Sequence, residues 1–222
     1  MAGNPARTPA TVLVIDDHPL FRKGVLQLLQ STENLRPVGE ADNGDAGIAC
    51  AHALAPDLIL LDLHMKAGKD GIETLQALRA QGIESRIVIL TVSDRPGDII
   101  AAIRAGADDY LLKDTEPETL LGRAQNILFG DDPVSAELTA LLTTALREDQ
   151  AGRRRSLDDL TERERLILRA LSRGQSNKHI ARELDIMEST VKVHIHSLLK
   201  KLQFHSRVEA AIWAVSIGLG KR

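Results

Sequence analysis

The stretch TVLVIDDHP (Thr11–Pro19) decides the fold class of this 222-residue chain. A nearly continuous apolar run leads directly into two aspartates, which is typical of a strand that is buried on both faces and presents polar groups at its carboxyl end. Further short apolar runs with β-branched residues follow at intervals of about 20 to 30 residues. We predict five strands, at residues 11–16, 35–40, 57–62, 86–91 and 109–113.

Helices are expected between these strands, because apolar residues there recur at i, i+4, i+7 and i+8. The spacing is clearest after the first and last strands, in Phe21, Val25, Leu28 and Leu29, and in Leu120, Ala124, Ile127 and Leu128. Strands that alternate with helices predict a parallel sheet covered on both faces. The first part of the chain is therefore expected to be a doubly wound, flavodoxin-like α/β domain with a five-stranded sheet.

Polar residues end four of the five predicted strands, and the carboxyl ends of parallel strands meet at one edge of a sheet. These residues are Asp16 and Asp17, Asp62, Thr91 and Lys113. A single polar residue often ends a strand without any role, but four strands that do so at one edge favour a site. Three crowded carboxylates suit a divalent cation, and Mg²⁺ is expected because no His or Cys cluster indicates a softer metal. A lysine and a hydroxyl beside that cation predict a phosphoryl site with Asp62 as the nucleophile.

Four motifs resemble the receiver domain of bacterial two-component response regulators: VIDDHP (14–19), DLILLDLHM (57–65), LTVS (90–93) and GADDYLLKD (106–114). The resemblance implies that a partner sensor histidine kinase phosphorylates Asp62. It also implies that the carboxylates of Asp16, Asp17 and Asp62 bind Mg²⁺ together with the backbone carbonyl of His64.

The same resemblance implies a phosphate-sensing group made of Thr91, Lys113 and Tyr110. Thr91 and Lys113 would bind the phosphoryl group, and Tyr110 would change rotamer when Thr91 moves toward it. An ordinary half-buried strand tyrosine is the alternative interpretation of Tyr110.

The loop after Asp62 departs from the receiver pattern. Lys66 stands where receivers usually have proline, and Gly71 lies nine residues after Asp62 instead of eight. A longer loop without proline's fixed φ predicts slower or less stable phosphorylation. One alternative is therefore a regulator that works without phosphorylation. Another is a phosphatase that uses Asp62 as its nucleophile, although such enzymes place a second acid where this chain has His64.

The formal net charge of −3 hides a difference between the two ends of the chain. From Arg153 onward there are 15 Lys and Arg against 8 Asp and Glu, whereas the residues before it carry 13 against 23. A basic second part predicts a polyanionic partner, and double-stranded DNA is the expected one. We predict a receiver domain at 1–130, a linker helix and tether at 131–156, and a DNA-binding domain at 157–222.

The linker helix is predicted from a short apolar stripe, and the tether from a charged stretch with three consecutive arginines. The stripe consists of Leu138, Leu141, Leu142 and Ala145, and the arginines are Arg153–Arg155. No apolar run approaches the roughly 18 residues of a membrane span, and the N-terminus does not look like a signal peptide. We therefore expect no membrane association and a cytoplasmic location.

The basic part contains helix start and stop signals in the order of a helix-turn-helix. Thr161 and Glu164 form a T-x-x-E capping box for a helix that Gly174 ends, and Ser176 caps a second helix over 177–184. A third helix is predicted over 188–202, with buried Val191, Ile195, Leu198, Leu199 and Leu202. Met187 stands at its N-cap position, where no side chain can accept a hydrogen bond from the backbone.

The opposite face of the third helix is polar and basic apart from one valine, and helical phase places Ser197 on it. LTERERLILRAL, SNKHIARELDI and STVKVHIHSLLKKL resemble the three helices of the LuxR/FixJ-type helix-turn-helix. The resemblance makes this face the DNA-reading surface, formed by Ser189, Thr190, Lys192, Val193, His196 and Lys200. The valine would contact a thymine methyl group, and the lysines would contact guanine or phosphate.

The last helix opens with a second predicted capping box, Ser206 and Glu209, and is apolar nearly all round. Such a helix cannot bury both faces in a small domain, so the surplus face is expected to form a homodimer on DNA. That face consists of Ala210, Trp213, Ala214 and Ile217. A helix that folds back on its own small core is the alternative.

The resemblance covers the whole chain and extends to the nitrate/nitrite-responsive members of the NarL/FixJ family. It is carried by GADDYLLKDTEPETLL, STVKVHI and SRVEAAIWA. The resemblance implies a DNA-binding transcriptional response regulator, which is not an enzyme.

Overall fold

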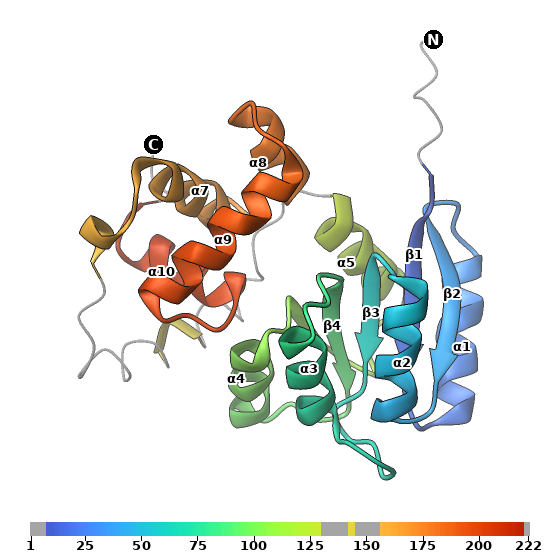
Figure 1. Ribbon diagram of the computed structural model, residues 1–222. Coiled ribbons are helices and arrows are strands. Elements are labelled where there is room, and N and C mark those ends of the chain that lie inside the picture. The colour runs from blue at the N-terminus through green and yellow to red at the C-terminus, as the bar shows by residue number, and fades with distance from the viewer. Residues whose placement is uncertain (1–7, 130–141, 145–155, 220–222) are drawn as a thin grey trace. The chain divides into compact units, whose positions relative to one another are not determined.

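A computed structural model describes residues 8–129, 142–144 and 156–219 of the chain (Figure 1). Its internal contacts divide the chain into two compact units. The first unit contains residues 1–92 and 111–128, and the second contains residues 93–110 and 129–222.

A five-stranded sheet in the order β2-β1-β3-β4-β5 forms the centre of the α/β part. Strand β1 pairs in parallel with both β2 and β3, and β3 pairs in parallel with β4. All four residues of β3 are buried, as expected for a strand that is covered on both faces. The doubly wound prediction is confirmed, and the strand bounds are Ala10–Ile15, Leu35–Ala41, Leu58–Leu61, Arg86–Thr91 and Asp109–Leu112.

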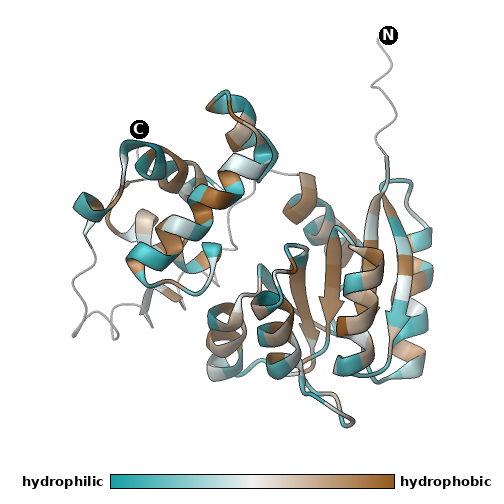
Figure 2. Ribbon diagram, viewed as in Figure 1, coloured by the Kyte–Doolittle hydropathy of each residue, from teal (hydrophilic) through white to brown (hydrophobic). Residues whose placement is uncertain are grey.

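The helices that follow the strands are amphipathic, and the apolar strands are the brown centre of this part in Figure 2. Their bounds are α1 Pro19–Gln30, α2 Gly44–Leu54, α3 Gly71–Ala80, α4 Pro96–Ala105 and α5 Pro117–Phe129. Helices α2 and α3 pack together on one face of the sheet. A hydrogen bond from Gln125 Nε2 to Thr32 Oγ1 (3.3 Å) links α5 to the end of α1 on the other face.

The C-terminal part is entirely helical in the described residues. It consists of a short 3₁₀ turn, η2 Leu157–Asp159, and of α7 Glu162–Ser172, α8 Asn177–Glu183, α9 Glu188–Leu202 and α10 Arg207–Ser216. The capping box of Thr161 and Glu164 is confirmed, and Ser176 accepts the His179 N–H as predicted. Helix α9 has the predicted bounds, and Met187 provides no side-chain cap.

The second predicted capping box is only half right. Ser206 does accept the Glu209 N–H, but the Glu209 carboxylate accepts the backbone N–H of His205 instead of that of Ser206. The hydrogen bond of Glu209 thus anchors the backbone of the residue before the cap.

Most of the predicted linker lies outside the described residues, including Leu138, Leu141, Ala145 and the Arg153–Arg155 run. Residues 142–144 are helical, and Leu142 is buried. Within the described ranges, no helix combines the length and the apolar character that crossing a membrane requires.

Candidate functional site

The register of the sheet brings the ends of β1 and β3 side by side. Ile15 pairs with Leu61, and the Asp62 N–H donates to the Ile15 carbonyl at 2.9 Å. Asp16 and Asp62 therefore follow adjacent strand ends, and each is only 2% exposed. The backbone N–H of Lys113 donates to the Thr91 carbonyl at 2.8 Å, which brings the end of β5 to the end of β4.

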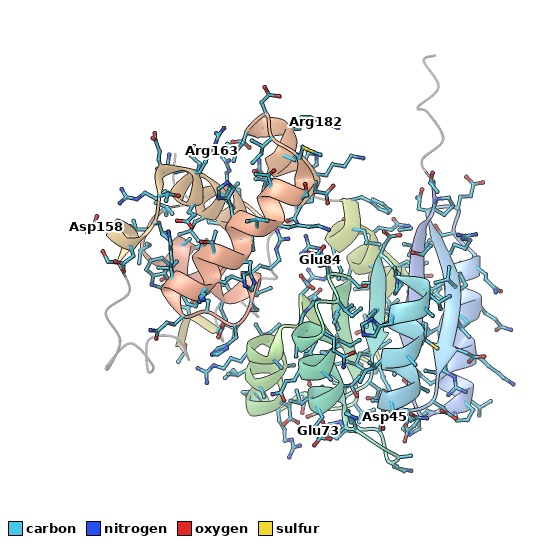
Figure 3. All side chains as sticks on the ribbon, viewed as in Figure 1. Asp45, Glu73, Glu84, Asp158, Arg163 and Arg182 are labelled. Carbon is cyan, nitrogen blue, oxygen red and sulfur yellow. The ribbon has the colours of Figure 1, made fainter. Side chains whose placement is uncertain are left out.

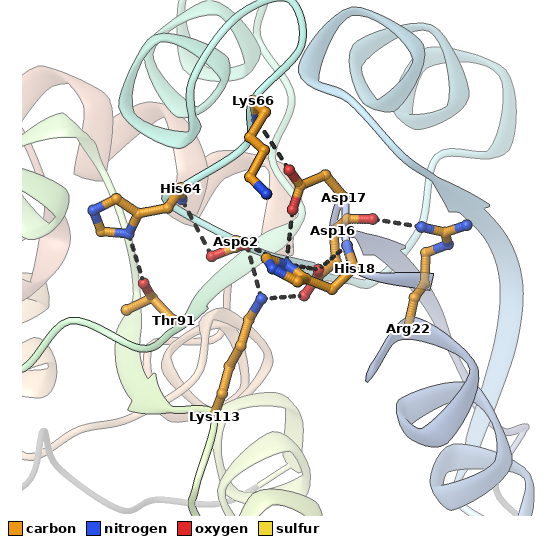
Figure 4. Close-up of polar contacts among 9 residues, drawn as sticks. All are labelled: Asp16, Asp17, His18, Arg22, Asp62, His64, Lys66, Thr91 and Lys113. Atoms are coloured by element: carbon orange, nitrogen blue, oxygen red, sulfur yellow. Dashed lines mark hydrogen bonds and ion pairs between the residues drawn. The ribbon is translucent and has the colours of Figure 1, made fainter. Parts of the chain in front are cut away.

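Lys113 links the two buried aspartates, as Figure 4 shows. Its Nζ lies 2.7 Å from Asp16 Oδ2 and 2.8 Å from Asp62 Oδ2. The same ammonium lies 4.8 Å from the centre of the Phe21 ring, which gives it a cation–π contact from α1. The lysine thus neutralises part of the negative charge that the strand ends bring together.

Asp17 lies beside this pair, and only one of its two carboxylate oxygens accepts a hydrogen bond in the described residues. Its Oδ2 accepts the backbone N–H of Lys66 at 3.0 Å. Its Oδ1 is buried and accepts no hydrogen bond within the described residues, although it lies 2.8 Å from His18 Nδ1. Asp16, Asp17, His18 and Asp62 can offer ligand atoms that all lie within 4.8 Å of one another.

The cluster is incompletely neutralised: it has three carboxyl groups, one lysine and one buried oxygen that accepts no hydrogen bond among the residues that the structure describes. Burial of a charged or polar group is costly unless it is paired, so a divalent cation bound by oxygen atoms fits this arrangement. Sequence reasoning missed His18 as a member of the cluster. Its position directly after the two aspartates could have identified it, because the three residues leave the strand together.

Thr91 is completely buried, and its hydroxyl forms a hydrogen bond with the ring of His64. Thr91 Oγ1 and His64 Nδ1 are 3.1 Å apart. The backbone N–H of His64 donates to Asp62 Oδ1 at 3.2 Å, so the same residue contacts both Asp62 and Thr91. The interaction of His64 with Thr91 was not predicted, because only the His64 carbonyl was considered.

Tyr110 is half-buried in β5 and donates its hydroxyl proton to the Ser93 carbonyl at 2.7 Å. Burial raises the pKa of Tyr110 to about 12, which keeps the phenol protonated at neutral pH. The tyrosine therefore holds the backbone just after β4, two residues beyond Thr91.

Gly71 has a role that only glycine can fill in the loop after Asp62. A Cβ atom at this position would lie 2.3 Å from the Asp62 carbonyl oxygen and 2.4 Å from Leu63 Cα. The Gly71 N–H also donates to the Leu63 carbonyl at 2.9 Å. The loop is one residue longer than in most receivers, so its glycine stands at position 71, one position later than usual. The glycine still lies against the backbone of Asp62 and Leu63, where no side chain fits.

The loop after Asp62 lacks the proline that would restrict its backbone, but an ion pair and a capping box hold it at both ends. Lys69 forms an ion pair with Asp45 at the start of α2. Asp70 and Glu73 form a complete capping box at the start of α3. Figure 3 shows Asp45 and Glu73 at the same edge of the α/β part, so these contacts fix both flanks of the loop.

The exposed face of α9 carries the residues predicted to read DNA. Val193 is 67% exposed, and a single exposed apolar side chain of this kind is common on protein surfaces. Thr190 and Lys192 are half-buried, and the exposed members of the set are Ser189, Val193, His196 and Lys200. The buried side of α9 includes Val191, Ile195, Leu198 and Leu202, as predicted, while Leu199 is only half-buried.

The prediction that Ser197 belongs to the exposed face is wrong. Its hydroxyl donates to Glu164 Oε1 of α7 at 2.7 Å, and Lys201 Nζ lies 2.7 Å from Glu164 Oε2. Burial alone would raise the pKa of Glu164, but hydrogen bonds from Lys201, Ser197 and Thr161 outweigh it and lower the pKa to about 2. Glu164 therefore holds α9 against α7 as a buried carboxylate.

Most of the predicted dimer face is buried in the structure. Ala210, Trp213 and Ala214 are each at most 3% exposed, and the Trp213 and Phe204 rings are 5.6 Å apart. Ile217 is 43% exposed. A dimer through α10 stays a prediction, with exposed apolar surface only at the end of the helix.

Two family descriptions match this chain. The model of the response regulator receiver domain matches residues 12–125, and that of the bacterial regulatory proteins of the luxR family matches residues 158–214. The chain is a bacterial two-component response regulator. Its second domain is a LuxR-type helix-turn-helix, so the response regulator is a DNA-binding transcription regulator.

Known relatives of this response regulator align over nearly its full length. The nitrate/nitrite response regulator protein NarL of Escherichia coli is 50% identical over 205 residues, covering 92% of this chain and 94% of NarL. A nitrate/nitrite response regulator homologue of Haemophilus influenzae is 49% identical and covers 90% of this chain and 94% of its own length.

Solved structures agree with this assignment. The response regulator ChrA of a heme-sensing two-component system covers 96% of this chain and 100% of its own length, with 32% identity and a TM-score of 0.50. The receiver domain of NarL from Mycobacterium tuberculosis covers 56% of this chain and 99% of its own length, with 34% identity and a TM-score of 0.54.

Proposed function

We propose that phosphorylation of Asp62 by a sensor histidine kinase switches this response regulator between two states that differ in DNA binding. The observation that carries the proposal is the position of Lys113, whose Nζ lies within 2.8 Å of both Asp16 and Asp62. A lysine between two buried carboxylates is suited to bind a phosphoryl oxygen that is added to one of them.

The transfer is a displacement at phosphorus. A carboxylate oxygen of Asp62 forms the new O–P bond while the N–P bond of the kinase's phosphohistidine breaks, and the released histidine keeps the electron pair of that bond. Lys113 then binds one phosphoryl oxygen, and the hydroxyl of Thr91 donates a hydrogen bond to another. Tyr110 would respond through the backbone after β4, because its hydroxyl is bound to Ser93.

Mg²⁺ is the cation that we propose for the acidic cluster. Asp16, Asp17 and Asp62 would hold it together with the backbone carbonyl of His64. The buried Oδ1 of Asp17, which accepts no hydrogen bond in the described part of the chain, supports this assignment. When bound, the cation would neutralise phosphoryl oxygens during the transfer.

The DNA-binding half would use α9 in the major groove. We propose that Val193 contacts a thymine methyl group, and that Lys192, His196 and Lys200 contact base acceptors and phosphates. Ser189 and Thr190 lie in the first turn of α9, where a recognition helix meets base edges. Two protomers would bind two half-sites, and Ile217 is the exposed residue of the proposed dimer face.

We further propose that the upstream signal is nitrate or nitrite and that the protein works in the cytoplasm. The signal is supported by the names of the relatives in Escherichia coli and Haemophilus influenzae. The proposed domain limits are 1–130, 131–156 and 157–222, and the family matches over 12–125 and 158–214 support them.

The deciding experiment compares DNA binding of the full-length protein with and without acetyl phosphate and Mg²⁺. The wild type should be labelled and should bind a nitrate-regulated promoter more tightly after labelling. Asp62→Asn should lose both effects, whereas Asp42→Asn, a change at an exposed aspartate, should keep them. An unlabelled wild type that binds DNA equally well under both conditions would favour a regulator that works without phosphorylation. Turnover of an aryl phosphate would favour the phosphatase alternative.

The DNA-reading face can be tested separately. Lys192→Ala should weaken binding by about 1 to 3 kcal/mol, because it removes a contact to a base or a phosphate. Lys23→Ala, a change at an exposed lysine of α1, is the matched control and should leave the affinity unchanged in a gel-shift titration.

A further inference from the structure

The hydrogen bond between His64 and Thr91 occupies the hydroxyl that the proposed function assigns to a phosphoryl oxygen. Thr91 Oγ1 lies 3.1 Å from His64 Nδ1, and Figure 4 shows this contact on the side of Asp62 away from Asp17 and His18. Thr91 is 0% exposed, whereas the His64 ring is exposed. A surface side chain thus covers a buried group of the site.

We propose that His64 is a positioning residue that restrains the phosphorylation switch by accepting the hydroxyl proton of Thr91 in the unphosphorylated protein. In the His64 tautomer with an unprotonated Nδ1, that nitrogen accepts the hydroxyl proton of Thr91. A hydroxyl group has one proton, so in this arrangement Thr91 cannot also donate it to a phosphoryl oxygen. Binding of the phosphoryl group at Asp62 therefore requires release of Thr91 from His64. This inference rests on the proposed function, because it needs a phosphoryl group at Asp62.

His64 is well placed for this restraint because its backbone contacts the same aspartate. Its N–H donates to Asp62 Oδ1 at 3.2 Å, so the resting positions of Asp62 and Thr91 are both set by one residue. The ring is exposed and can move into solvent without disturbing the buried strands. The hydrogen bond can therefore break when a better partner reaches Thr91, which is what a reversible restraint requires.

The direction of the effect separates this role from a direct contact to the phosphoryl group. If His64 restrains Thr91, loss of the ring nitrogen should strengthen binding of a phosphoryl analogue. If His64 instead bound or stabilised the phosphoryl group, the same change should weaken that binding. The two roles thus predict opposite signs for one measurement.

The test uses beryllofluoride with Mg²⁺ as the phosphoryl analogue and follows its binding to the full-length protein by fluorine NMR. His64→Phe keeps a ring over Thr91 but removes the hydrogen-bond acceptor. It should tighten beryllofluoride binding about three- to tenfold, because the free energy of one modest hydrogen bond no longer opposes binding. His64→Asn keeps an acceptor at the same distance from the backbone and should restore the affinity of the wild type.

A double-mutant cycle with Thr91→Val shows whether the effect passes through Thr91. Thr91→Val itself should weaken binding, and His64→Phe should then have no further effect. Unchanged or weaker binding by His64→Phe alone, or equal tightening in both backgrounds, would overturn the inference. If beryllofluoride did not bind to the wild type at all, the proposed function would be overturned together with this inference. That result can be told apart from the two results above, in which the wild type does bind.

Discussion

Two groups of buried carboxyl side chains, one in each domain, use similar residues and differ in how completely they are neutralised. In the receiver, Asp16 and Asp62 are each 2% exposed and share the ammonium group of Lys113. In the DNA-binding domain, Glu164 is also 2% exposed and lies 2.7 Å from the ammonium group of Lys201.

The two groups differ in their hydrogen bonds. Glu164 Oε1 accepts a hydrogen bond from Ser197, and Oε2 accepts from Lys201 and from the Thr161 N–H. A single carboxylate therefore has a lysine of its own and donors on two further residues. In the receiver, Lys113 faces more than one carboxyl group, and Asp17 Oδ1 is buried without a hydrogen bond in the described residues. A fully bonded carboxylate supports the fold, while an incompletely bonded group retains the capacity to bind a ligand.

The largest effect on stability is expected from Glu164→Gln. The substitution removes the charge that Lys201, Ser197 and Thr161 stabilise, so it should lower the free energy of unfolding of the DNA-binding domain by about 2 to 3 kcal/mol. Urea unfolding followed by the fluorescence of Trp213, the only tryptophan, reports on this domain. Glu188→Gln in the first turn of α9 is the exposed control. An equal loss in both variants would contradict the special role of Glu164.

Asp17→Asn should cost the receiver no stability, in contrast to the loss expected for Glu164→Gln in the DNA-binding domain. Neutralising one of three crowded carboxyl groups should leave the receiver equally stable or stabilise it by up to about 1 kcal/mol, because repulsion is relieved. Hydrogen exchange of the β1 and β3 amides measures this change.

The same substitution should weaken Mg²⁺ binding at least about tenfold, because it removes a charged ligand. Asp42→Asn, at an exposed aspartate, should change neither quantity. A clear loss of receiver stability in Asp17→Asn would show that Asp17 has a structural role similar to that of Glu164.

The pH dependence of stability tests the contribution of Glu164 in the wild-type protein. The pKa of Glu164 is about 2 in the folded protein and 4.5 as an ordinary value, so its contribution is complete above about pH 4.5 and is lost as the pH falls toward 2. Between pH 6 and pH 3 this loss should amount to about 1 to 2 kcal/mol, since the exposed Lys201 is partly screened by water.

Urea unfolding at several pH values, followed by Trp213, measures this loss. The Glu164→Gln variant should show a correspondingly flatter profile, because glutamine does not titrate in this range. An identical profile in both proteins would assign the acid sensitivity to other carboxyl groups.

Much of the fold was predictable because the patterns are local and strong. The buried strands are nearly continuous apolar runs, and β4 and α9 have the predicted bounds. The approach of Asp16, Asp62 and Lys113 also follows from the rule that parallel strands end at one edge. The loop after Asp62 was harder to predict, because the close approach of Gly71 to Asp62 involves the backbone rather than a side-chain pattern.

The amino-acid sequence by itself determined the two-domain order, the α/β and helix-turn-helix classes, and the strand ends that carry the acidic cluster. Only the tertiary structure decided that Ser197 faces Glu164, that His64 contacts Thr91, and that Glu209 binds the His205 backbone. The reason is physical. Periodicity specifies which side of an element is buried, whereas a particular hydrogen bond depends on side-chain rotamers and on how residues distant in the chain pack against each other.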